Sequence, residues 1–490
     1  MFNFKSKFFK SDKLYLSNRS RLMGEIEVPG DKSISQRALI IGLISNGNTK
    51  IQNILESEDV IHTMRAVVLL GGKVSIKNDL LEIRGVGLGN ISSPPKPVYM
   101  GNSGTGTRLL LGVVAGSNAT VTFYGDSSLT SRPMSRVIDP LKKMGAKFVS
   151  HEEGKLPLTV IGARRKGIIL PIEYTTPVPS AQVKSSLILA SLTARGTSKI
   201  IEKSRTRKNT EEMLINCGVK IISSNTKNKR YLTQLEGMQY IKSFDVNVPG
   251  DPSTAAFLAV AAIITKNSKI ELKNIYHDKF RLKIFFILKK MGAKIHIKKN
   301  NRGNCDITVK SSNLKNLTIP AKYSSALIDE YPILSIAASS ADGKMTMRGL
   351  KELRFKESDR LTAIFKGLNQ SGIKTELIKD TLIIQGRKSI RGGNIIHASN
   401  DHRIAMSFNI LSLITKSPII IKGNSSIRTS FPLFFDSLSI LGVNIKRDEI
   451  SLYKLSQLKS DIEALKISHQ VIKKEVKEFK IKIDKLISQK

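Results

Sequence analysis

The sequence predicts an α/β fold of two lobes, each built from three copies of one repeated unit, with a helical tail at the C-terminus. Three observations lead to this prediction. A phrase that joins an apolar helix to a strand through Gly occurs six times, and each copy also contains a second helix that is rich in small residues. In addition, the phrase "VPGDKS", Val28–Ser33, returns as "VPGDPS", Val248–Ser253.

The phrase around the recurring Gly defines the repeated unit. Each copy, such as "MGAKFV", follows a segment with apolar residues three and four apart, and Gly suits the left-handed position that ends a helix. An alternating strand is expected directly afterwards. Six copies at intervals of 70 to 80 residues fill the chain, at Gly71, Gly145, Gly218, Gly292, Gly372 and Gly442.

The second helix of each unit is apolar on nearly every side, which is typical of a buried helix. We therefore expect two three-unit lobes in which sheets surround buried helices. The six helical segments are residues 33–45, 103–116, 180–194, 251–264, 329–341 and 400–414.

The two "VPGD" phrases mark where each three-unit half starts. One precedes the second helix of unit one, and the other precedes the equivalent helix of unit four. We expect both to be crossings between the lobes. The predicted ranges are 1–29 with 250–449 for lobe one (units four to six), 30–249 for lobe two (units one to three) and 450–490 for the tail.

The tail has a heptad pattern. From Leu458 on, apolar residues follow alternating steps of four and three through Leu486, with His469 at the one position that is not apolar. This spacing predicts a coiled-coil-like helix that self-associates or docks on a partner, or else packs on its own domain.

The overall charge of the chain is +39, from 79 Lys and Arg against 40 Asp and Glu. This surplus suggests an anionic partner, either nucleic acid or small phosphorylated and carboxylated molecules. Because the Lys residues are dispersed among many Ile and Asn residues, a bias in composition explains the surplus equally well.

No segment has the roughly 18 uninterrupted apolar residues of a membrane span, and the start "MFNFKSKFFKSDK" lacks the apolar core of a secretory signal. We therefore expect a cytoplasmic protein without membrane attachment, with an organellar presequence as the alternative. Cys217 and Cys305 lie in apolar segments, where Cys behaves as a small buried hydrophobe, so we expect neither a disulfide framework nor a zinc site.

Cations recur at the predicted starts of the buried helices, where the helix dipole disfavours them by about 0.3–1 kcal/mol each. An anion bound there would be stabilised by both the cations and the helix N–H groups. The pattern predicts a cleft between the lobes that holds phosphate and carboxylate groups. The cations are Lys32, Arg37, Arg108, Lys184 and Arg403, with Arg132, Arg136, Arg354, Lys356 and Arg360 nearby.

Few acids occur among these cations. Asp329 in "IDEYPIL" and Glu357 in "KESDR" are candidates for general acid and base catalysis, because a carboxylate beside an anionic substrate is costly unless it moves a proton or holds a hydroxyl group. The alternatives are a helix cap for Asp329 and a surface ion pair for Glu357. His402 is expected to be a packing residue. The loop "GNSGTGTR" lacks the Gly-Lys-Ser/Thr ending of a nucleotide-binding P-loop.

Nine motifs together resemble the 5-enolpyruvylshikimate-3-phosphate synthase family from about Leu22 to Gly442. The resemblance implies an inside-out α/β barrel of two lobes with six βαβαββ units, which is the enolpyruvyl transferase fold. It also implies transfer of the enolpyruvyl group of phosphoenolpyruvate to the 5-hydroxyl of shikimate 3-phosphate, without metal or cofactor. The motifs are "GDKSISQRA", "GNSGTGTRLL", "SRPMSRVIDPL", "SAQVKSSLILA", "VPGDPSTAAF", "DEYPIL", "LRFKESDRL", "NDHRIAMS" and "TSFPLFFDSL".

The same resemblance implies roles for individual residues. Asp329 would take the 5-hydroxyl proton, and Glu357 and Lys32 would handle the methylene proton in an order that stays open. Shikimate 3-phosphate would be held by Lys32, Ser33, Arg37, Ser180, Gln182, Arg207, Asp329 and Lys356. Phosphoenolpyruvate would be held by Lys32, Gly104, Arg132, Gln182, Arg360 and Arg403.

The sequence departs from the family pattern at two positions. Gln36 stands where many members have His, and Asn209 stands where a related subgroup usually has His. Both lie beside expected ligands, so we expect an effect on affinity more than on activity.

Two alternatives and the state of association stay open. The sister transferase that acts on UDP-N-acetylglucosamine shares the fold but usually carries a reactive Cys on a mobile loop. A basic nucleic-acid-binding protein would need aromatic platforms or a contiguous basic face, and aromatic residues make up only 6% of the chain, without Trp. We expect small-molecule substrates, no nucleic acid and a monomer, unless the tail associates.

Overall fold

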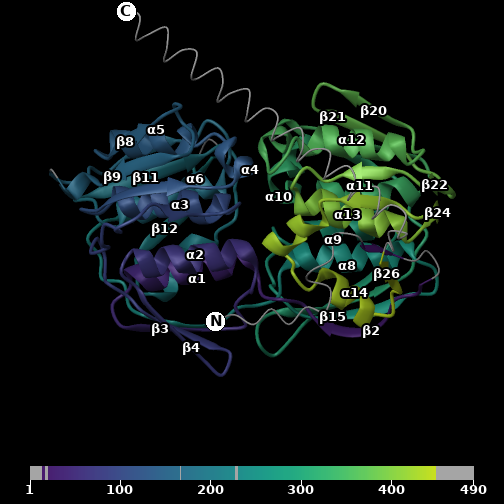
Figure 1. Ribbon diagram of the computed structural model, residues 1–490, viewed down its shortest axis with the longest axis horizontal. Coiled ribbons are helices and arrows are strands. Elements are labelled where there is room, and N and C mark those ends of the chain that lie inside the picture. The colour runs from purple at the N-terminus through teal and green to yellow at the C-terminus, as the bar shows by residue number, and fades with distance from the viewer. Residues whose placement is uncertain (1–13, 17–19, 166, 227–229, 448–490) are drawn as a thin grey trace, which may run out of the picture. The chain divides into compact units, whose positions relative to one another are not determined.

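The computed structural model describes residues 14–16, 20–165, 167–226 and 230–447. Residues 1–446 form one compact unit, and the chain from Arg447 on is a separate one. The predicted heptad helix lies outside the described residues. The ribbon in Figure 1 confirms the predicted α/β class, with helices and sheets alternating along the chain.

The apolar core of residues 16–446 consists of two clusters. One cluster takes its members from residues 16–28 and 255–443, and the other takes them from residues 34–248. We use these clusters to define lobe one and lobe two, respectively. The domain boundaries given above stay a prediction at the level of single residues.

Lobe two contains helices and three four-stranded sheets. Its helices are α1 (Lys32–Ile44), α2 (Glu58–Leu69), α3 (Gly104–Ala115), α4 (Ser127–Thr130), α5 (Ser135–Lys143), α6 (Ala181–Ser191) and α7 (Asn209–Asn216), with the 3₁₀ turn η1 (Ala163–Arg165). Its strands are β3 (Asn48–Gln52), β4 (Lys73–Lys77), β5 (Leu80–Arg84), β6 (Val98–Tyr99), β7 (Thr120–Tyr124), β8 (Lys147–Ser150), β9 (Leu158–Ile161), β10 (Glu173–Thr175), β11 (Thr197–Glu202), β12 (Ile221–Asn225), β13 (Tyr231–Glu236) and β14 (Asp245–Asn247).

Lobe one repeats this plan. Its helices are α8 (Pro252–Ile264), α9 (Lys283–Lys290), α10 (Ser324–Leu327), α11 (Tyr331–Ser340), α12 (Arg360–Gln370), α13 (His402–Ser412) and α14 (Phe434–Ile440), with the 3₁₀ turns η2 (Ala321–Tyr323), η3 (Lys351–Phe355) and η4 (Asn424–Thr429). Its strands are β1 (Leu14–Leu16), β2 (Met23–Glu27), β15 (Lys269–Ile275), β16 (Lys294–Lys299), β17 (Cys305–Lys310), β18 (Thr318–Ile319), β19 (Lys344–Met347), β20 (Thr375–Ile378), β21 (Thr381–Gln385), β22 (Ile390–Gly392), β23 (Ile395–His397), β24 (Thr415–Ser417), β25 (Ile420–Lys422) and β26 (Ile445–Arg447).

The four-stranded sheets share one topology. In each, the first pair of strands is parallel and the next two pairings are antiparallel, as in the order β6-β7-β9-β8. Unit six departs from this plan, because its described strands form the two-stranded pairs β22-β24, β23-β25 and β1-β26.

The lobes exchange their first strands. In unit four, β2 from the start of the chain pairs in parallel with β15. In unit one, β14 from the middle of the chain pairs in parallel with β3. The two "VPGD" phrases follow these strands and lead into α1 and α8, and Gly30 and Gly250 form an antiparallel bridge between them. The repeated phrase therefore lies where the chain passes between the two clusters.

The glycines that end the repeated helices confirm the prediction from their spacing. All six have φ between +84° and +107°, a region that favours Gly because it has no Cβ. The six glycines are Gly71, Gly145, Gly218, Gly292, Gly372 and Gly442.

The six small-residue helices are confirmed as buried elements. They are α1, α3 and α6 in lobe two and α8, α11 and α13 in lobe one (Figure 1), and nearly all their residues are buried. Helix α11 starts later than predicted, at Tyr331, with Glu330 at its N-cap position and no side-chain cap bond. Asp329 is therefore not the N-cap, which removes that alternative for its role.

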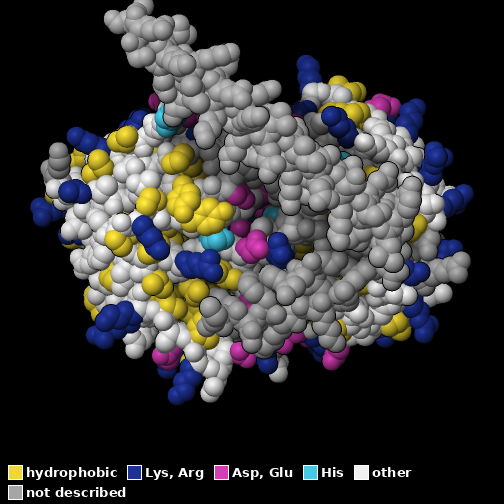
Figure 2. All heavy atoms as spheres, viewed as in Figure 1, with side chains coloured by type: hydrophobic (Ala, Val, Ile, Leu, Met, Phe, Trp, Pro, Cys, Tyr) yellow, Lys and Arg dark blue, Asp and Glu magenta, His cyan; other side chains and the backbone are white. Residues whose placement is uncertain are grey.

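The surface bears on the rival functions. None of the helices in the described part of the chain combines the length and the apolar character needed to cross a bilayer. Among the described side chains that are visible in Figure 2, Lys and Arg are scattered between apolar and acidic ones.

Candidate active site

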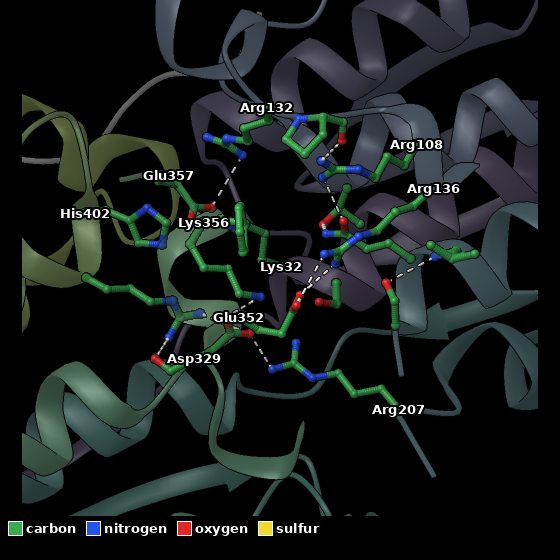
Figure 3. Close-up of a pocket in the computed structure, with 18 of the residues that line it drawn as sticks. Lys32, Arg108, Arg132, Arg136, Arg207, Asp329, Glu352, Lys356, Glu357 and His402 are labelled. Carbon is green, nitrogen blue, oxygen red and sulfur yellow. Dashed lines mark hydrogen bonds and ion pairs between the residues drawn. The ribbon is translucent and has the colours of Figure 1, made fainter. Parts of the chain in front are cut away.

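A cavity of about 160 Å³ lies between segments of both lobes. Eight of its lining side chains are Lys or Arg and four are Asp or Glu (Figure 3). This excess of positive charge suits an anionic ligand. The cations are Lys32, Arg108, Arg132, Arg136, Arg207, Arg281, Lys356 and Arg403, and the acids are Asp251, Asp329, Glu352 and Glu357.

Most of the predicted site residues meet in this cavity. Three of them, Arg37, Gly104 and Arg360, do not line it. The ten that do are Lys32, Ser33, Arg132, Ser180, Gln182, Arg207, Asp329, Lys356, Glu357 and Arg403.

Helix starts bring several of these residues to the cavity. The carboxylate of Asp31 accepts a hydrogen bond from the Ile34 amide at 2.8 Å and caps α1, whose first residue is Lys32. Asp401 caps α13 in the same way and places Arg403 in its first turn. An anion at these positions would meet both helix N–H groups and cationic side chains.

The Asp329 carboxylate lies among four cationic side chains. It lies 2.5 Å from Arg207 Nη2, 3.4 Å from Arg360 Nη1, 3.8 Å from Arg403 Nη2 and 4.0 Å from Lys356 Nζ. Burial alone would raise the pKa of Asp329, but the positive charges of these four residues outweigh burial and hold the pKa well below its usual range. Asp329 is therefore ionised and can accept a proton.

Glu357 occupies a similar environment on the same lobe. It pairs with Arg360 and lies 3.6 Å from Arg132 Nη1 of lobe two. Burial opposes ionisation, yet Arg360 and Arg132, with smaller contributions from His402 and Lys32, keep the pKa of Glu357 well below its usual range. The alternative of an exposed surface pair is wrong, because Arg360 is fully buried.

Lys32 has a carboxylate partner in lobe two. Its Nζ donates to Asp59 Oδ2 at 2.9 Å, and both side chains are largely buried. Asp59 belongs to the first turn of α2, where a negative charge is favoured by the helix dipole. This contact holds the Lys32 side-chain nitrogen against the cavity wall.

The lobe-two wall of the cavity is a hydrogen-bonded row. Gln182 Oε1 accepts from Arg108 Nη1 at 2.8 Å, and Gln182 Nε2 donates to Thr105 Oγ1 at 2.8 Å. Arg108 also donates to the Pro133 carbonyl at 3.1 Å. Burial, reinforced by the charge of Arg132, lowers the pKa of Arg108 to about 10. Ser180 caps the start of α6 through the Val183 amide at 3.4 Å.

Ion pairs between the lobes cross the cavity. Arg136 of lobe two forms two hydrogen bonds with Glu352 of lobe one, at 2.7 and 3.2 Å, and its guanidinium lies 5.8 Å from the ring centroid of Phe355. The Ser128 hydroxyl donates to the Glu357 carbonyl at 2.9 Å. Together with the Arg207–Asp329 pair, these contacts hold the two walls together.

Three predicted residues lie behind the wall. Arg37 donates to the Ser33 carbonyl at 3.0 Å, and burial together with the charge of Arg207 lowers the pKa of Arg37 to about 10. A Cβ on Gly104 would lie 2.8 Å from Arg132 Nη1, so Gly104 lets the guanidinium pack on the backbone. Arg360 stands behind Asp329 and Glu357 and also bonds Asp401 at 2.8 Å.

The prediction that Lys184 faces a bound anion is wrong. Its side chain is fully buried and points into lobe two, where Nζ lies 2.7 Å from Glu211 and 2.9 Å from Glu202. Lys184 is the fourth residue of α6, beyond the first turn that faces the cavity. Arg354 also points elsewhere, to Asp359 at 2.7 Å.

Several cavity residues were absent from the predicted site. The sequence pattern identifies Arg108 and Arg136 as cations near helix starts but gives them no ligand role. Glu352 and Arg281 gave no signal, because their partners lie in distant segments. His402, expected to be a packing residue, is buried and bonded to Thr429 Oγ1 at 3.2 Å, yet it also lines the cavity.

The described residues give no support for a metal or a reactive thiol. They contain no group of three or more His, Cys, Asp and Glu side chains able to hold a metal ion. Cys217 and Cys305 are buried outside the cavity wall, and burial raises the pKa of both thiols to about 12.

Comparison with known families places this cavity in context. Residues 16–438 match the family model described as EPSP synthase (3-phosphoshikimate 1-carboxyvinyltransferase). The matched range includes every residue of the cavity wall and all of the predicted site.

Individual relatives agree with the family match. The chain is 42% identical over 433 residues to the 3-phosphoshikimate 1-carboxyvinyltransferase of Nitrobacter winogradskyi, covering 86% of this chain and 96% of the relative. It is 41% identical to that of Bartonella quintana, with 86% and 97% covered. A solved structure of EPSP synthase from Acinetobacter baumannii superposes with a TM-score of 0.76 at 35% identity and covers 89% of this chain and 99% of its own.

Proposed function

The chain belongs to the EPSP synthase family, and we propose that the cavity between its lobes transfers the enolpyruvyl group of phosphoenolpyruvate to the 5-hydroxyl of shikimate 3-phosphate and releases phosphate. This is a step of the shikimate pathway, which leads to chorismate and the aromatic amino acids. The observation that carries the proposal is the pair of ionised carboxylates, Asp329 and Glu357, held among cations in one cavity.

We assign shikimate 3-phosphate to the part of the cavity lined by Ser33, Ser180, Gln182 and Arg207. Hydroxyl and guanidinium groups converge there, and Arg37 supports Ser33 from behind through its carbonyl. Phosphate dianions are bound well by such charge-assisted donors.

We assign phosphoenolpyruvate to the part near Arg132, Arg403, Lys32 and the Gly104 loop. Arg360 supports this part from behind, through Glu357 and Asp329. The phosphate and carboxylate of phosphoenolpyruvate would replace these two acids as partners of the cations. Lys356, 4.0 Å from Asp329, lies between the two parts and can contact either substrate.

The addition step follows from the charge states. Asp329 accepts the proton of the 5-hydroxyl while the hydroxyl oxygen bonds to C2 of phosphoenolpyruvate. The electron pair of the C2=C3 π bond takes up a proton at C3, so that the double bond becomes a single bond. The product of this step is a tetrahedral intermediate. Lys32 Nζ donates a hydrogen bond to Asp59, whereas the ionised carboxylate of Glu357 is an acceptor. This difference favours Lys32 as the donor to C3.

The elimination step reverses the proton movement at C3. A proton leaves C3, the electron pair of that C–H bond forms the new double bond, and the bond from C2 to the phosphate oxygen breaks. Ionised Glu357 is suited to accept this proton. The cations of the wall stabilise the charge that develops on the leaving phosphate.

Phosphate release tests the proposal. We expect phosphate to appear only when shikimate 3-phosphate and phosphoenolpyruvate are supplied together, and not with either alone. Release with UDP-N-acetylglucosamine in place of shikimate 3-phosphate would contradict the assignment. The burial of both Cys residues already argues against that substrate, because the sister enzyme usually uses a reactive Cys.

A further inference from the structure

A buried hydrogen-bond network joins the starts of α1, α2 and α3 behind the cavity wall. At its centre is Gln36, which is fully buried one helical turn after Lys32. Its Nε2 lies 2.6 Å from Ser103 Oγ of α3, 3.1 Å from Thr63 Oγ1 of α2 and 3.3 Å from the Asp59 carbonyl. One amide group therefore touches two other helices.

The donors and acceptors of this network follow from the bonds that its two hydroxyl groups make. The Thr63 hydroxyl donates to the Asp59 carbonyl at 2.8 Å and lies 3.5 Å from Ser103 Oγ, from which it can accept. Ser103 Oγ accepts from the Gly106 amide at 3.3 Å and also from Gln36. The Gln36 amide thus supplies the donors that these buried oxygens need.

Ser103 connects the network to a loop of the cavity wall. Ser103 is the N-cap of α3, and the residues around it contact the wall directly. Asn102 Oδ1 accepts from Arg132, and Thr105 Oγ1 accepts from Gln182 at 2.8 Å. A shift of Ser103 would therefore move both side chains.

The space around the network is tightly fitted. A Cβ on Gly106 would lie 2.5 Å from Thr63 Oγ1 and 2.7 Å from Ser103 Oγ, so the absence of a side chain there makes room for both hydroxyls. At the other end, Asp59 holds Lys32 Nζ at 2.9 Å. The network thus links two parts of the wall that are distant in sequence.

We propose that Gln36 is a positioning residue for phosphoenolpyruvate: through Ser103 it holds the 102–106 loop, and with it Arg132, in the geometry that binds this substrate. The assignment rests on the proposed function. Gln36 does not touch the substrate. Of the four residues assigned to shikimate 3-phosphate, Gln182 contacts this loop through Thr105, whereas Arg132 of the phosphoenolpyruvate part is bonded to Asn102 beside Ser103. Loss of the Gln36 amide should therefore act more strongly on phosphoenolpyruvate than on shikimate 3-phosphate.

The test begins with Gln36→Leu, which keeps the approximate size of the side chain and removes the amide. We expect the KM for phosphoenolpyruvate to rise about five- to ten-fold, as the loss of one buried hydrogen bond implies. The KM for shikimate 3-phosphate should change less than about two-fold. The matched control is Ser45→Ala, which removes a buried hydroxyl bonded at 2.7 Å to Ile41 at the far end of α1 and should leave both KM values unchanged.

A double-mutant cycle tests the route through Ser103. If Gln36 acts through Ser103, Gln36→Leu should have little further effect on the KM for phosphoenolpyruvate in a Ser103→Ala background. Additive effects in the cycle, or equal changes in both KM values, would overturn the positioning role in an active enzyme. A wild type that releases no phosphate would instead overturn the proposed function and this role with it.

Discussion

Arg207 of lobe two and Asp329 of lobe one form an ion pair of 2.5 Å across the cavity. The two residues are 122 positions apart in the chain and lie in the residue ranges of different lobes. Each has a second role in the proposed reaction, because Arg207 binds a phosphate and Asp329 accepts a proton. Substrate binding must therefore exchange this internal pair for a pair between Arg207 and the substrate.

Loss of the Arg207 guanidinium should weaken the binding of one substrate selectively. We expect Arg207→Gln to raise the KM for shikimate 3-phosphate about 10- to 100-fold, the value of one charge-assisted hydrogen bond. Steady-state kinetics with each substrate varied in turn gives the measurement. Arg205→Gln, an exposed position two residues earlier, is the control. A larger rise in the KM for phosphoenolpyruvate would show that Arg207 binds that substrate and that the assignment to shikimate 3-phosphate is wrong.

Removal of the Asp329 charge should separate catalysis from binding. We expect Asp329→Asn to lower kcat by about 10²- to 10⁴-fold, the contribution of a general base. Binding of shikimate 3-phosphate, measured by calorimetry, should persist or tighten because the surrounding cations lose their internal partner. Asp342→Asn, at an exposed position, should leave both quantities unchanged. A near-normal kcat would remove Asp329 from the mechanism.

The Asp329 carboxylate should also affect how the free energy of unfolding depends on pH in the acidic range. Its pKa is held well below the ordinary 3.8, so its contribution to the free energy of unfolding is fully present above the unfolded-state pKa. That contribution is lost as the pH falls through the folded-state pKa. The stability gap between wild type and Asp329→Asn should therefore be constant at neutral pH and narrow only below about pH 4.

Urea unfolding at a series of pH values measures this gap. Ser45→Ala removes no titratable group, so the difference in free energy of unfolding between this variant and the wild type should not vary with pH. A gap that stays constant below pH 4, or that widens as the pH falls, would mean that the pKa of Asp329 is not depressed.

Local patterns in the sequence predicted the repeat and many of the charged residues of the cavity wall, whereas Ser33, Ser180, Gln182 and Arg207 were implied by the family resemblance. The spacing of Gly71 and its five counterparts was enough to predict six helix ends, because a helix end and its positive φ depend on neighbouring residues. Lys32 and Arg403 were predicted for the same reason, since each stands in the first turn of a capped helix. Lys184 was misjudged because it stands one turn further, where the side chain faces a different neighbour.

Contacts between distant segments could not be predicted in this way. Arg136 and Glu352 are 216 residues apart, and only the juxtaposition of the lobes makes them partners. Lys32 and Asp59 are closer, 27 residues apart, but their pairing depends on how α1 packs against α2. The sequence shows which residues are charged, whereas the packing of helices and lobes decides which charges meet.

The Arg136–Glu352 pair should help to hold the two cavity walls together. Both side chains are about a third exposed, at 36% and 31%, so we expect only a modest coupling of about 0.2–1 kcal/mol. In a cycle of Arg136→Gln and Glu352→Gln, the loss of kcat/KM in the double variant should be smaller than the product of the single losses. Independent, multiplicative losses would show that the pair does not act as a unit.

The buried trio of Lys184, Glu202 and Glu211 should matter for folding alone. Burial disfavours the charged form of Lys184, but the two carboxylates outweigh it and raise the pKa of Lys184. We expect Lys184→Met to lower the free energy of unfolding by about 3–5 kcal/mol, because it leaves two buried carboxylates without their partner.

A triple variant distinguishes this role from a catalytic one. Lys184→Met combined with Glu202→Gln and Glu211→Gln removes all three charges and should recover most of the lost stability in urea unfolding. Because none of the three lines the cavity, both KM values should match the wild type in the triple variant. A restored stability with a raised KM would return Lys184 to the substrate site, where its position near the start of α6 had suggested it belonged.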